Sequence, residues 1–407
     1  MSQHWDVIVV GGGMVGAAAA LGLAQQSLKV LILEREPIAT AFSAEQPFGI
    51  RVSALTRASE NILRNLGAWS GIEQRRLHPF KSMYVWEQNS KASVRFSSDE
   101  IGEDNLGYTV ENDLIQAALW EQIAQQPLIE ARYGVSLNQV NYDETTQQSS
   151  LITQSGDVLC AQLILAADGA FSKVRQLASI GLDSHDYQMC TVVGCVKTEY
   201  SHQDTCWQRY TQEGPFAFLS MANGYSSIAW YLPLEKMQWA LALDQQSFID
   251  EIEQASAGQL GRVLEVGERG AFPLVRRHAL QYVKPGVALI GDSAHTINPQ
   301  AGQGVNLGFL DVAALLDVIA LAKQKNISLG NLGVLRKYER RRRGDNALIQ
   351  RSMEMFDWMF EQQDSIKSAV RPSLLALAHQ WQTPKAWLTE QTLQGRGDLP
   401  TLAQRIS

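Results

Sequence analysis

The first 35 residues alternate short apolar runs with polar breaks in a way that is typical of a β-α-β unit. The pattern predicts a buried strand at residues 6–10, a helix of small residues at 17–27 and a second strand at 29–35. Glycines fill the turn between the first strand and the helix. Because such units place their strands side by side in the same direction, the sequence predicts a parallel sheet here.

The rest of the chain predicts an α/β domain interrupted by a second domain. Helical periodicity recurs at 57–69 and 111–125, and a strand-turn-helix pattern returns at 161–178. Residues 190–245 form short, aromatic-rich runs that predict an antiparallel sheet, and 286–292 resembles a parallel strand again. The predicted division is a discontinuous first domain (1–75, 105–180 and 272–345), an inserted second domain (76–104 and 181–271) and a helical C-terminal region (346–407).

Composition and charge exclude several classes of protein. The chain has 407 residues, 45% hydrophobic and 19% charged, as in an ordinary globular protein of two or three domains. Its net charge of −7 argues against nucleic acid as a partner, which would require a basic face. Four cysteines without a C-x-x-C pair favour a reduced cytoplasmic protein, and no metal site is predicted. The N-terminus lacks a secretory pattern, and no uninterrupted apolar run reaches the roughly 18 residues of a membrane span.

The glycine turn after the first strand has the spacing of a dinucleotide-binding motif. Gly11 permits a tight turn, Gly13 lets the backbone approach a pyrophosphate, and Gly16 lets the helix pack against the strand. The helix N-terminus then faces the phosphate charge. Glu34 ends the second strand, where an acidic residue binds a ribose. The motif does not distinguish FAD from NAD; its predicted contacts also include Met14, Val15 and Arg35.

Two further strand ends carry an aspartate beside a glycine. Asp168 and Gly169 follow one apolar run, and Gly291 and Asp292 follow another. Each pair has a plain interpretation: a turn in which Ser172 caps a helix, and a strand-to-helix loop punctuated by proline and glycine. Their occurrence in this order after G-x-G-x-x-G favours a cofactor site instead.

These three motifs resemble those of the single-component flavin-dependent aromatic hydroxylases, whose fold is that of para-hydroxybenzoate hydroxylase. The details are most similar to the ubiquinone-biosynthesis branch, and the likeness extends from residue 5 to about 350. HPFKSMYVWE (78–87) resembles the branch members that act on 2-polyprenyl-3-methyl-6-methoxy-1,4-benzoquinol. The other matching segments are RVSAL (51–55), GYTVEN (107–112), GAFPL (270–274), RRHALQYVKPGVALIGDSAHTINPQAGQGVNLG (276–308) and YERRRRGDN (338–346).

The resemblance implies an FAD-binding Rossmann-like domain with an inserted antiparallel-sheet substrate domain and a helical C-terminus. It assigns Asp292 to the ribityl chain of FAD and Arg51 to the FAD phosphates, and it ties Asp168 and Gly169 to both FAD and NAD(P)H. A loop from residue 299 to 306 is expected against the isoalloxazine ring. Its predicted contacts are Pro299, Gly302, Gly304, Val305 and Asn306.

Several positions leave two interpretations open. His78 would either deprotonate a phenolic substrate or, because it precedes a proline, be an ordinary loop residue. The basic run 336–346 is either a solvated helix face or a docking surface for anionic lipid or a biosynthetic complex. Ser220 and Asn112 depart from the family pattern, where relatives have a proline and an FAD-contacting arginine. Five aromatic residues either line an apolar cleft or fill a sheet core: Trp86, Trp207, Phe216, Phe218 and Trp230.

The resemblance implies an FAD-dependent monooxygenase that uses NADPH or NADH and molecular oxygen. It would hydroxylate a polyprenylated benzoquinol in ubiquinone biosynthesis through a C4a-hydroperoxyflavin, a reaction in which the cofactor carries the hard step. Two alternatives stay open: a flavin-dependent quinone or lipid reductase, and a catalytically silent flavoprotein that scaffolds a biosynthetic complex. The expected location is the cytoplasm, with peripheral binding to the inner membrane left open.

Overall fold

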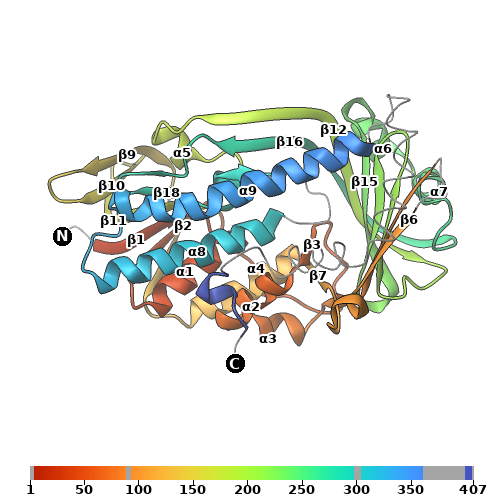
Figure 1. Ribbon diagram of the computed structural model, residues 1–407, viewed down its shortest axis with the longest axis horizontal. Coiled ribbons are helices and arrows are strands. Elements are labelled where there is room, and N and C mark those ends of the chain that lie inside the picture. The colour runs from red at the N-terminus through yellow and green to blue at the C-terminus, as the bar shows by residue number, and fades with distance from the viewer. Residues whose placement is uncertain (1–3, 89–92, 298–303, 361–398, 406–407) are drawn as a thin grey trace.

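The computed structural model describes residues 4–88, 93–297, 304–360 and 399–405 of the chain. Figure 1 shows an elongated molecule with a sheet and long helices at one end and a second sheet at the other. Two long strands, β12 (Leu182–Thr198) and β16 (Val263–Ala279), run between the two ends. Where the chain divides into domains stays a prediction.

The first sheet contains five parallel strands whose carboxyl ends lie in register. The strand order is β17-β18-β11-β1-β2-β8, and all pairs from β18 to β8 are parallel. Val10 lies opposite Ala166 and Leu33, and Ala166 lies opposite Leu289. The strands are β1 (His4–Val10), β2 (Val30–Glu34), β8 (Ile129–Tyr133), β11 (Val158–Ala166), β17 (Val283–Lys284) and β18 (Val287–Leu289), with β9 (Leu137–Asp143) and β10 (Gln148–Thr153) as an antiparallel extension.

Helices complete the core of the first sheet. The small side chains Ala17–Ala20 of α1 are fully buried, which lets this helix pack closely. Helix α8 (Gly304–Gln324) is long and apolar enough to cross a membrane, but 72% of its most apolar window is buried, so we assign it to the core. The other helices are α1 (Met14–Gln25), α2 (Arg57–Asn65), α3 (Trp69–Glu73), α4 (Asn112–Ala124), α5 (Lys173–Leu177) and α9 (Leu332–Phe360). The predicted boundary at residue 345 falls inside α9.

The second sheet has the order β19-β16-β12-β15-β14-β13-β5-β6 and is antiparallel except where β13 pairs with β5. Phe216, Phe218 and Trp230 are buried in one cluster with side chains of helices α6 and α7. They are therefore core residues, whereas Trp86 and Trp207 are half-buried. The elements are β5 (Ser82–Glu87), β6 (Ser93–Ser97), β13 (Thr205–Tyr210), β14 (Pro215–Ser220), β15 (Tyr225–Pro233), α6 (Met237–Ala242), α7 (Gln245–Ser256) and β19 (His295–Thr296).

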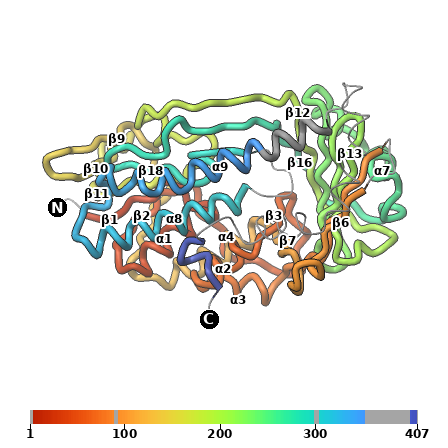
Figure 2. The backbone as a smooth tube through the Cα atoms, viewed as in Figure 1, coloured from red at the N-terminus to blue at the C-terminus, as the bar shows by residue number. Residues whose placement is uncertain are grey.

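A small antiparallel sheet lies between the two large ones. It consists of β3 (Val52–Leu55), β7 (Gly107–Glu111) and β4 (His78–Phe80), with β7 in the middle. Figure 2 shows β3 and β7 between the helical end of the molecule and β6. The hydroxyl group of Thr109 in β7 donates a hydrogen bond to the carbonyl oxygen of Ser220 in β14. This bond ties the small sheet to the second sheet.

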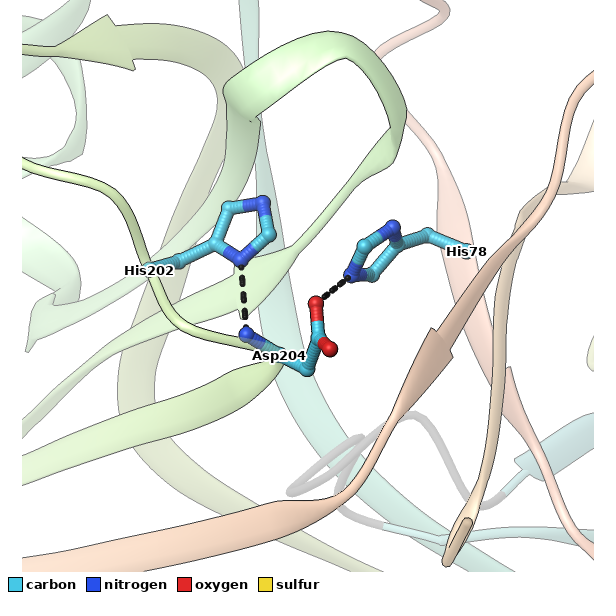
Figure 3. A group of neighbouring side chains, drawn as sticks. All are labelled: His78, His202 and Asp204. Atoms are coloured by element: carbon cyan, nitrogen blue, oxygen red, sulfur yellow. Dashed lines mark hydrogen bonds and ion pairs between the residues drawn. The ribbon is translucent and has the colours of Figure 1, made fainter. Parts of the chain in front are cut away.

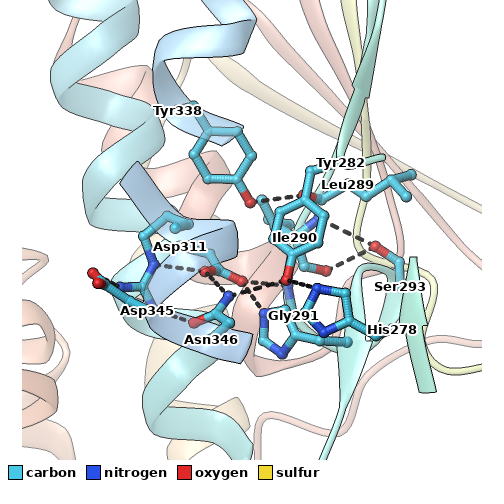
Figure 4. A network of polar contacts seen from close by, with 12 residues as sticks. His278, Tyr282, Leu289, Ile290, Gly291, Ser293, Asp311, Tyr338, Asp345 and Asn346 are labelled. Carbon is cyan, nitrogen blue, oxygen red and sulfur yellow. Dashed lines mark hydrogen bonds and ion pairs between the residues drawn. The ribbon is translucent and has the colours of Figure 1, made fainter. Parts of the chain in front are cut away.

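A buried polar network joins the end of β18 to helices α8 and α9 (Figure 4). Asp311 of α8 is fully buried. Its carboxylate accepts hydrogen bonds from the backbone N–H of Gly291 (3.1 Å), Nε of Arg342 (2.8 Å) and Nδ2 of Asn346 (3.0 Å). Nε2 of His295 lies 2.5 Å from the same carboxylate. One side chain therefore holds the turn after β18, the strand β19 and helix α9.

The charge state of Asp311 follows from its neighbours. Burial alone would raise the pKa of this carboxyl group, but the charges of His295 and Arg342 outweigh burial and lower the pKa to about 2. Arg342 is itself buried, with only 6% of its side chain exposed. The two groups thus form a buried ion pair, and Asn346 joins both by donating a hydrogen bond to Asp311 and accepting one from Arg342.

We predict that Asp311→Ala lowers the free energy of unfolding by about 3–5 kcal/mol, because it leaves the buried Arg342 without its main counterion. Asp317→Ala is the matched control. It removes a partly exposed carboxylate that accepts a hydrogen bond from Arg341 (2.8 Å), so the expected loss is roughly 0–1 kcal/mol. Urea denaturation followed by tryptophan fluorescence measures both losses. Equal losses would contradict the role assigned to Asp311.

The difference in the free energy of unfolding between wild type and Asp311→Ala should also depend on pH. Because the pKa of Asp311 is lower in the folded protein than in the unfolded chain, its stabilisation is complete above the ordinary aspartate pKa of about 3.9. The difference between wild type and Asp311→Ala should shrink as the pH falls through about 2. A difference that stays constant down to that pH would show that the carboxylate charge is not what stabilises the fold.

Candidate functional site

The three predicted motifs meet at one edge of the first sheet. Gly11 follows β1, Asp168 follows β11 and Gly291 follows β18, and these three strands are adjacent and parallel. Ligands of open α/β sheets bind at the carboxyl ends of such strands. Arg175 also connects two of the motifs, since it donates hydrogen bonds to the carbonyl oxygens of Ser293 (2.8 Å) and Ala170 (2.9 Å).

The turn after β1 can be built only from glycine at two positions. Gly11 adopts a φ of +101°, and a Cβ added to it would lie 2.4 Å from the carbonyl oxygen of Ala167. A Cβ on Gly16 would lie 1.9 Å from the carbonyl oxygen of Gly11. At Gly13, which precedes the first turn of α1, a Cβ would meet no described atom within 4 Å. The turn is therefore tight on its protein side and open at the helix N-terminus, as a pyrophosphate requires.

Glu34 is held beside this turn. Its Oε2 accepts a hydrogen bond from the N–H of Gly12 (2.5 Å), and its Oε1 accepts one from the N–H of the exposed Arg35 (2.6 Å). Trp120 donates a hydrogen bond to the carbonyl oxygen of Gly12 (2.8 Å). A carboxylate can accept about four hydrogen bonds, so Glu34 retains acceptor capacity for a ribose.

Met14 and Val15 start α1 and are half-buried. Both pack against the core of the first sheet. The side chain of Val15 lies against Gly291 and Gly308. Val15 therefore fixes the distance between the glycine turn and the late motif.

Asp292 is exposed to solvent, yet the surrounding protein desolvates its carboxyl group. Desolvation raises the pKa of Asp292, and the charges of His295, Arg51 and Arg277 oppose that rise. A side chain that is both exposed and desolvated indicates a recessed position. Arg51 stacks over the ring of Phe272, 5.4 Å from its centroid. Two arginines around a recessed carboxylate suit a ligand that carries both hydroxyl groups and phosphates.

Asp168 has one oxygen engaged and one free. Its Oδ2 accepts hydrogen bonds from the N–H groups of Lys173 (2.7 Å) and Val174 (3.1 Å) at the start of α5. Ser172 caps the same helix by accepting a hydrogen bond from the N–H of Arg175 (3.0 Å), as the plain interpretation of this turn predicted. Oδ1 of Asp168 is buried and has no partner among the described residues. That oxygen is available to a donor from a bound cofactor.

The loop expected against the flavin is described only at its end. Pro299 and Gly302 lie outside the described residues, and Gly304, Val305 and Asn306 form the first turn of α8. The side chain of Asn306 is committed to the protein. It accepts hydrogen bonds from Thr56 N (3.0 Å) and Ser59 Oγ (2.6 Å) and donates one to the carbonyl oxygen of Ala54 (2.8 Å). A contact between the backbone of Asn306 and the cofactor stays a prediction.

The two positions that depart from the family pattern both have partners in the protein. Asn112 starts α4, donates its N–H to the carbonyl oxygen of Arg51 (3.0 Å) and accepts a hydrogen bond from Ser53 (2.7 Å). It thereby holds the backbone that carries Arg51. Ser220 is fully buried in β14, and its carbonyl oxygen accepts the hydrogen bond from Thr109.

His78 belongs to a polar cluster between the small sheet and the second sheet (Figure 3). Its Nε2 lies 3.1 Å from Oδ1 of Asp204, close enough for an ion pair when the imidazole is protonated. The rings of His78 and His202 meet edge to face, with centroids 4.7 Å apart. Burial and His202 lower the pKa of His78, and Asp204 opposes that shift. His78 is therefore neutral at neutral pH.

Three side chains of this cluster place ligand-type atoms within 4.8 Å of one another. However, both ring nitrogens of His202 are engaged. Nδ1 accepts a hydrogen bond from the N–H of Asp204 (3.2 Å), and Nε2 lies 3.0 Å from the carbonyl oxygen of Met221. A metal would have to displace one of these bonds. We therefore interpret the cluster as a support for His78.

Sequence reasoning missed three residues that shape this site. Arg277 and His295 act on the charge of Asp292, and Asp311 holds the backbone of Gly291. His295 lies three positions after Asp292, a spacing that could have drawn attention to it. Nothing in the local pattern separates Arg277 from its neighbours, because its role depends on the pairing of β16 with β12 and β19.

We predict that Asp292→Ala weakens FAD binding at least about tenfold, because hydrogen bonds to a carboxylate are worth about 1.5–3 kcal/mol each. The protein without FAD should not be destabilised. An ionised carboxyl group whose pKa is raised by desolvation disfavours the folded state, so removing it costs no stability at neutral pH.

Fluorescence titration with FAD and thermal melting of the FAD-free protein measure the two effects of Asp292→Ala. Asp250→Ala, at an exposed position of α7, is the control and should change neither. If Asp292→Ala destabilised the FAD-free protein and left FAD affinity unchanged, the aspartate would be structural.

Two curated proteins are similar to this chain over most of its length. Escherichia coli (strain K12) 3-demethoxyubiquinol 3-hydroxylase is 39% identical over 355 residues, covering 87% of this chain and 90% of that protein. Drosophila melanogaster ubiquinone biosynthesis monooxygenase COQ6 is 33% identical over 383 residues, covering 84% of this chain and 79% of that protein.

Two solved structures show the same fold. The p-nitrophenol 4-monooxygenase PnpA from Pseudomonas putida DLL-E4 matches with a TM-score of 0.78 and 19% identity, over 98% of this chain and 100% of its own. Klebsiella pneumoniae HpxO, complexed with FAD and uric acid, matches with a TM-score of 0.71 and 15% identity, over 94% and 96%. The predicted fold is thereby confirmed. The FAD binding domain family matches residues 4–357, nearly the whole described structure, so this protein belongs to that family and FAD is its cofactor.

Proposed function

We propose that this protein is an FAD-dependent aromatic-ring hydroxylase of ubiquinone biosynthesis that uses NAD(P)H and molecular oxygen. The observation that carries the proposal is the junction of three cofactor motifs at one sheet edge, in a chain 39% identical over 87% of its length to a ubiquinol hydroxylase. The proposed substrate is 2-polyprenyl-3-methyl-6-methoxy-1,4-benzoquinol, hydroxylated at the ring position that its substituents leave open. The segment 78–87 supports this choice of substrate.

The protein's part in this chemistry is to bind and orient. When bound, FAD would supply the redox chemistry: it would be reduced by NAD(P)H and would activate molecular oxygen. In the proposal, Asp292 accepts hydrogen bonds from the ribityl hydroxyls, and Glu34 accepts them from the ribose. The N-terminus of α1 at Gly13 faces the pyrophosphate, and Arg51 adds positive charge. Oδ1 of Asp168 accepts a hydrogen bond from the cofactor or from NAD(P)H.

His78 is the proposed base for the quinol hydroxyl. Its imidazole is neutral, as a base must be, because burial lowers its pKa. The carboxylate of Asp204, 3.1 Å away, stabilises the imidazolium that forms when the proton is accepted. Removing the phenolic proton makes the ring more electron-rich, and electrophilic oxygen transfer requires such a ring.

The proposal includes a location. The prenyl tail of the substrate lies in a membrane, so we propose a cytoplasmic protein that binds peripherally to the inner membrane.

The alternative functions left open by the sequence differ in their products. A quinone or lipid reductase would consume NAD(P)H without inserting oxygen, and a silent scaffold would bind FAD without oxidising NAD(P)H.

Turnover under isotopically labelled oxygen separates these functions. The purified protein is incubated with the quinol, NAD(P)H and labelled oxygen, and the product is analysed by mass spectrometry. Hydroxylation adds one labelled oxygen atom to the ring. NAD(P)H oxidation with an unlabelled product would support the reductase, and no NAD(P)H oxidation by the FAD-loaded protein would support the scaffold.

We predict that His78→Gln lowers quinol hydroxylation at neutral pH by about 100-fold, while reduction of FAD by NAD(P)H is unchanged. In wild type, kcat/KM should fall on the acid side with a midpoint below about 6.5, the ordinary histidine pKa, because burial lowers the pKa of His78. Asp204→Asn should move that midpoint lower still, since Asp204 raises this pKa.

The control for His78 is His185→Gln, at an exposed position of β12. This variant should keep both the turnover and the pH profile of wild type. An unchanged acid limb in His78→Gln would assign the titrating group to another residue.

A further inference from the structure

Helix α9 runs alongside the long strands β12 and β16 (Figure 1). Residues of these elements line a basic pocket on the surface. Its volume is about 560 Å³. Arg340, Arg343 and Arg351 line it from α9, and Arg276 lines it from β16, where it pairs with the lining residue Asp183 (3.1 Å). The other carboxylate of the lining, Glu339, accepts a hydrogen bond from the N–H of Tyr282 (2.7 Å). The cofactor motifs do not line this pocket.

The spacing of the arginines on α9 explains this concentration of charge. Positions 340, 343, 347 and 351 recur at three or four residues, so they share one face of the helix. Within the described part of the chain, Arg340, Arg343 and Arg351 are exposed and have no carboxylate partner.

The basic run therefore divides into two functional sets. Arg341 pairs with Asp317, and Arg342 pairs with the buried Asp311. Both are committed to holding α9 on the fold. Arg340, Arg343 and Arg351 have no such partner among the described residues and are available to an outside anion, so the fold accounts for only part of the run.

Apolar side chains are exposed beside these cations. Leu280, which lines the pocket, is 53% exposed, and Leu348, next to the lining residue Ala347, is 46% exposed. Cations next to exposed leucines are typical of a surface that lies at a bilayer interface.

The net charge of the protein bears on whether it can bind an anionic membrane without such a pocket. With a net charge of −7, the protein as a whole is repelled by an anionic membrane. Only a local concentration of cations can overcome this repulsion at close range, because salt screens charges beyond about 8–10 Å. The arginines of α9 provide such a concentration.

We propose that this pocket docks the phosphate headgroup of an anionic membrane phospholipid. The guanidinium groups of Arg340, Arg343 and Arg351 bind the phosphate oxygens, and Leu280 and Leu348 contact the adjoining acyl region. The reason for docking rests on the proposed function, since the prenylated substrate lies in the bilayer. The site itself stands on the residues described above.

Vesicle binding tests the proposal without turnover. The FAD-loaded, full-length protein is sedimented with vesicles of phosphatidylcholine alone or of phosphatidylcholine with phosphatidylglycerol. The pocket variant combines Arg340→Gln, Arg343→Gln and Arg351→Gln. The control variant combines Lys325→Gln, Arg336→Gln and Lys337→Gln, which are exposed, carry the same charge change and do not line the pocket. FAD content and melting temperature verify that all proteins are folded.

Wild type and the control variant are expected to bind the anionic vesicles, and the pocket variant to bind on the order of 100-fold more weakly, at roughly fivefold per arginine. No protein should bind phosphatidylcholine alone. Equal weakening in the two variants would show attraction by net charge and overturn the site, as would undiminished binding by the pocket variant.

Two further measurements separate this proposal from its alternatives. Calorimetry with inorganic phosphate identifies a soluble ligand: phosphate binding that the pocket variant loses, without any vesicle binding by wild type, would overturn the lipid assignment. A water-soluble quinol without a prenyl tail should be hydroxylated equally by wild type and the pocket variant. If no protein hydroxylates any quinol while the vesicle results hold, the proposed function fails and the docking site stands.

Discussion

The parallel hydrogen bonding of β18, β11 and β1 is the constraint on which the site depends. Their last residues, Leu289, Ala166 and Val10, lie opposite one another, so the next residues of all three strands emerge at the same edge. The three segments are more than a hundred residues apart in the chain. Because side chains alternate between the faces of a sheet, a slip of one residue would turn Asp168 or Gly291 away from the glycine turn. Burial of the Val, Ile and Leu side chains on these strands makes such a slip costly.

Two aspartates near this edge, Asp292 and Asp311, have pKa values shifted in opposite directions. Desolvation raises the pKa of Asp292, whereas at Asp311 the counterions reverse the effect of burial and lower the pKa. The carboxylate of Asp311 therefore stabilises the fold, through its contacts with Arg342, His295 and the backbone N–H of Gly291. Asp292, one residue after Gly291, accepts no hydrogen bond from the described residues, so its carboxylate is open to a ligand. Because Asp311 holds the backbone of Gly291, it also fixes the position of Asp292.

Much of this arrangement could be predicted from local pattern, and the rest could not for physical reasons. The unit β1–α1–β2 was predictable because its apolar runs are buried on both sides. The N-terminal half of β12 was not, because residues 182–189 form a mostly exposed ribbon and show no apolar alternation. The partners of His78 lie more than 120 residues away, on a segment placed by the parallel pairing of β13 with β5. Asn306 fits the flavin loop by motif, but its side chain was already required by Thr56 and Ser59.

The shortness and late position of β18 have a consequence for how the protein is made. This strand has only three residues, Val287–Leu289, and the cofactor-facing turn follows it. A ribosome must therefore deliver the chain through Leu289 before the nucleotide edge can close. Until then β1, β2 and β11 expose apolar surface that will later be interior, during synthesis at about 5–20 residues per second. Flavin therefore cannot assist folding until the strand that completes its cradle has left the exit tunnel.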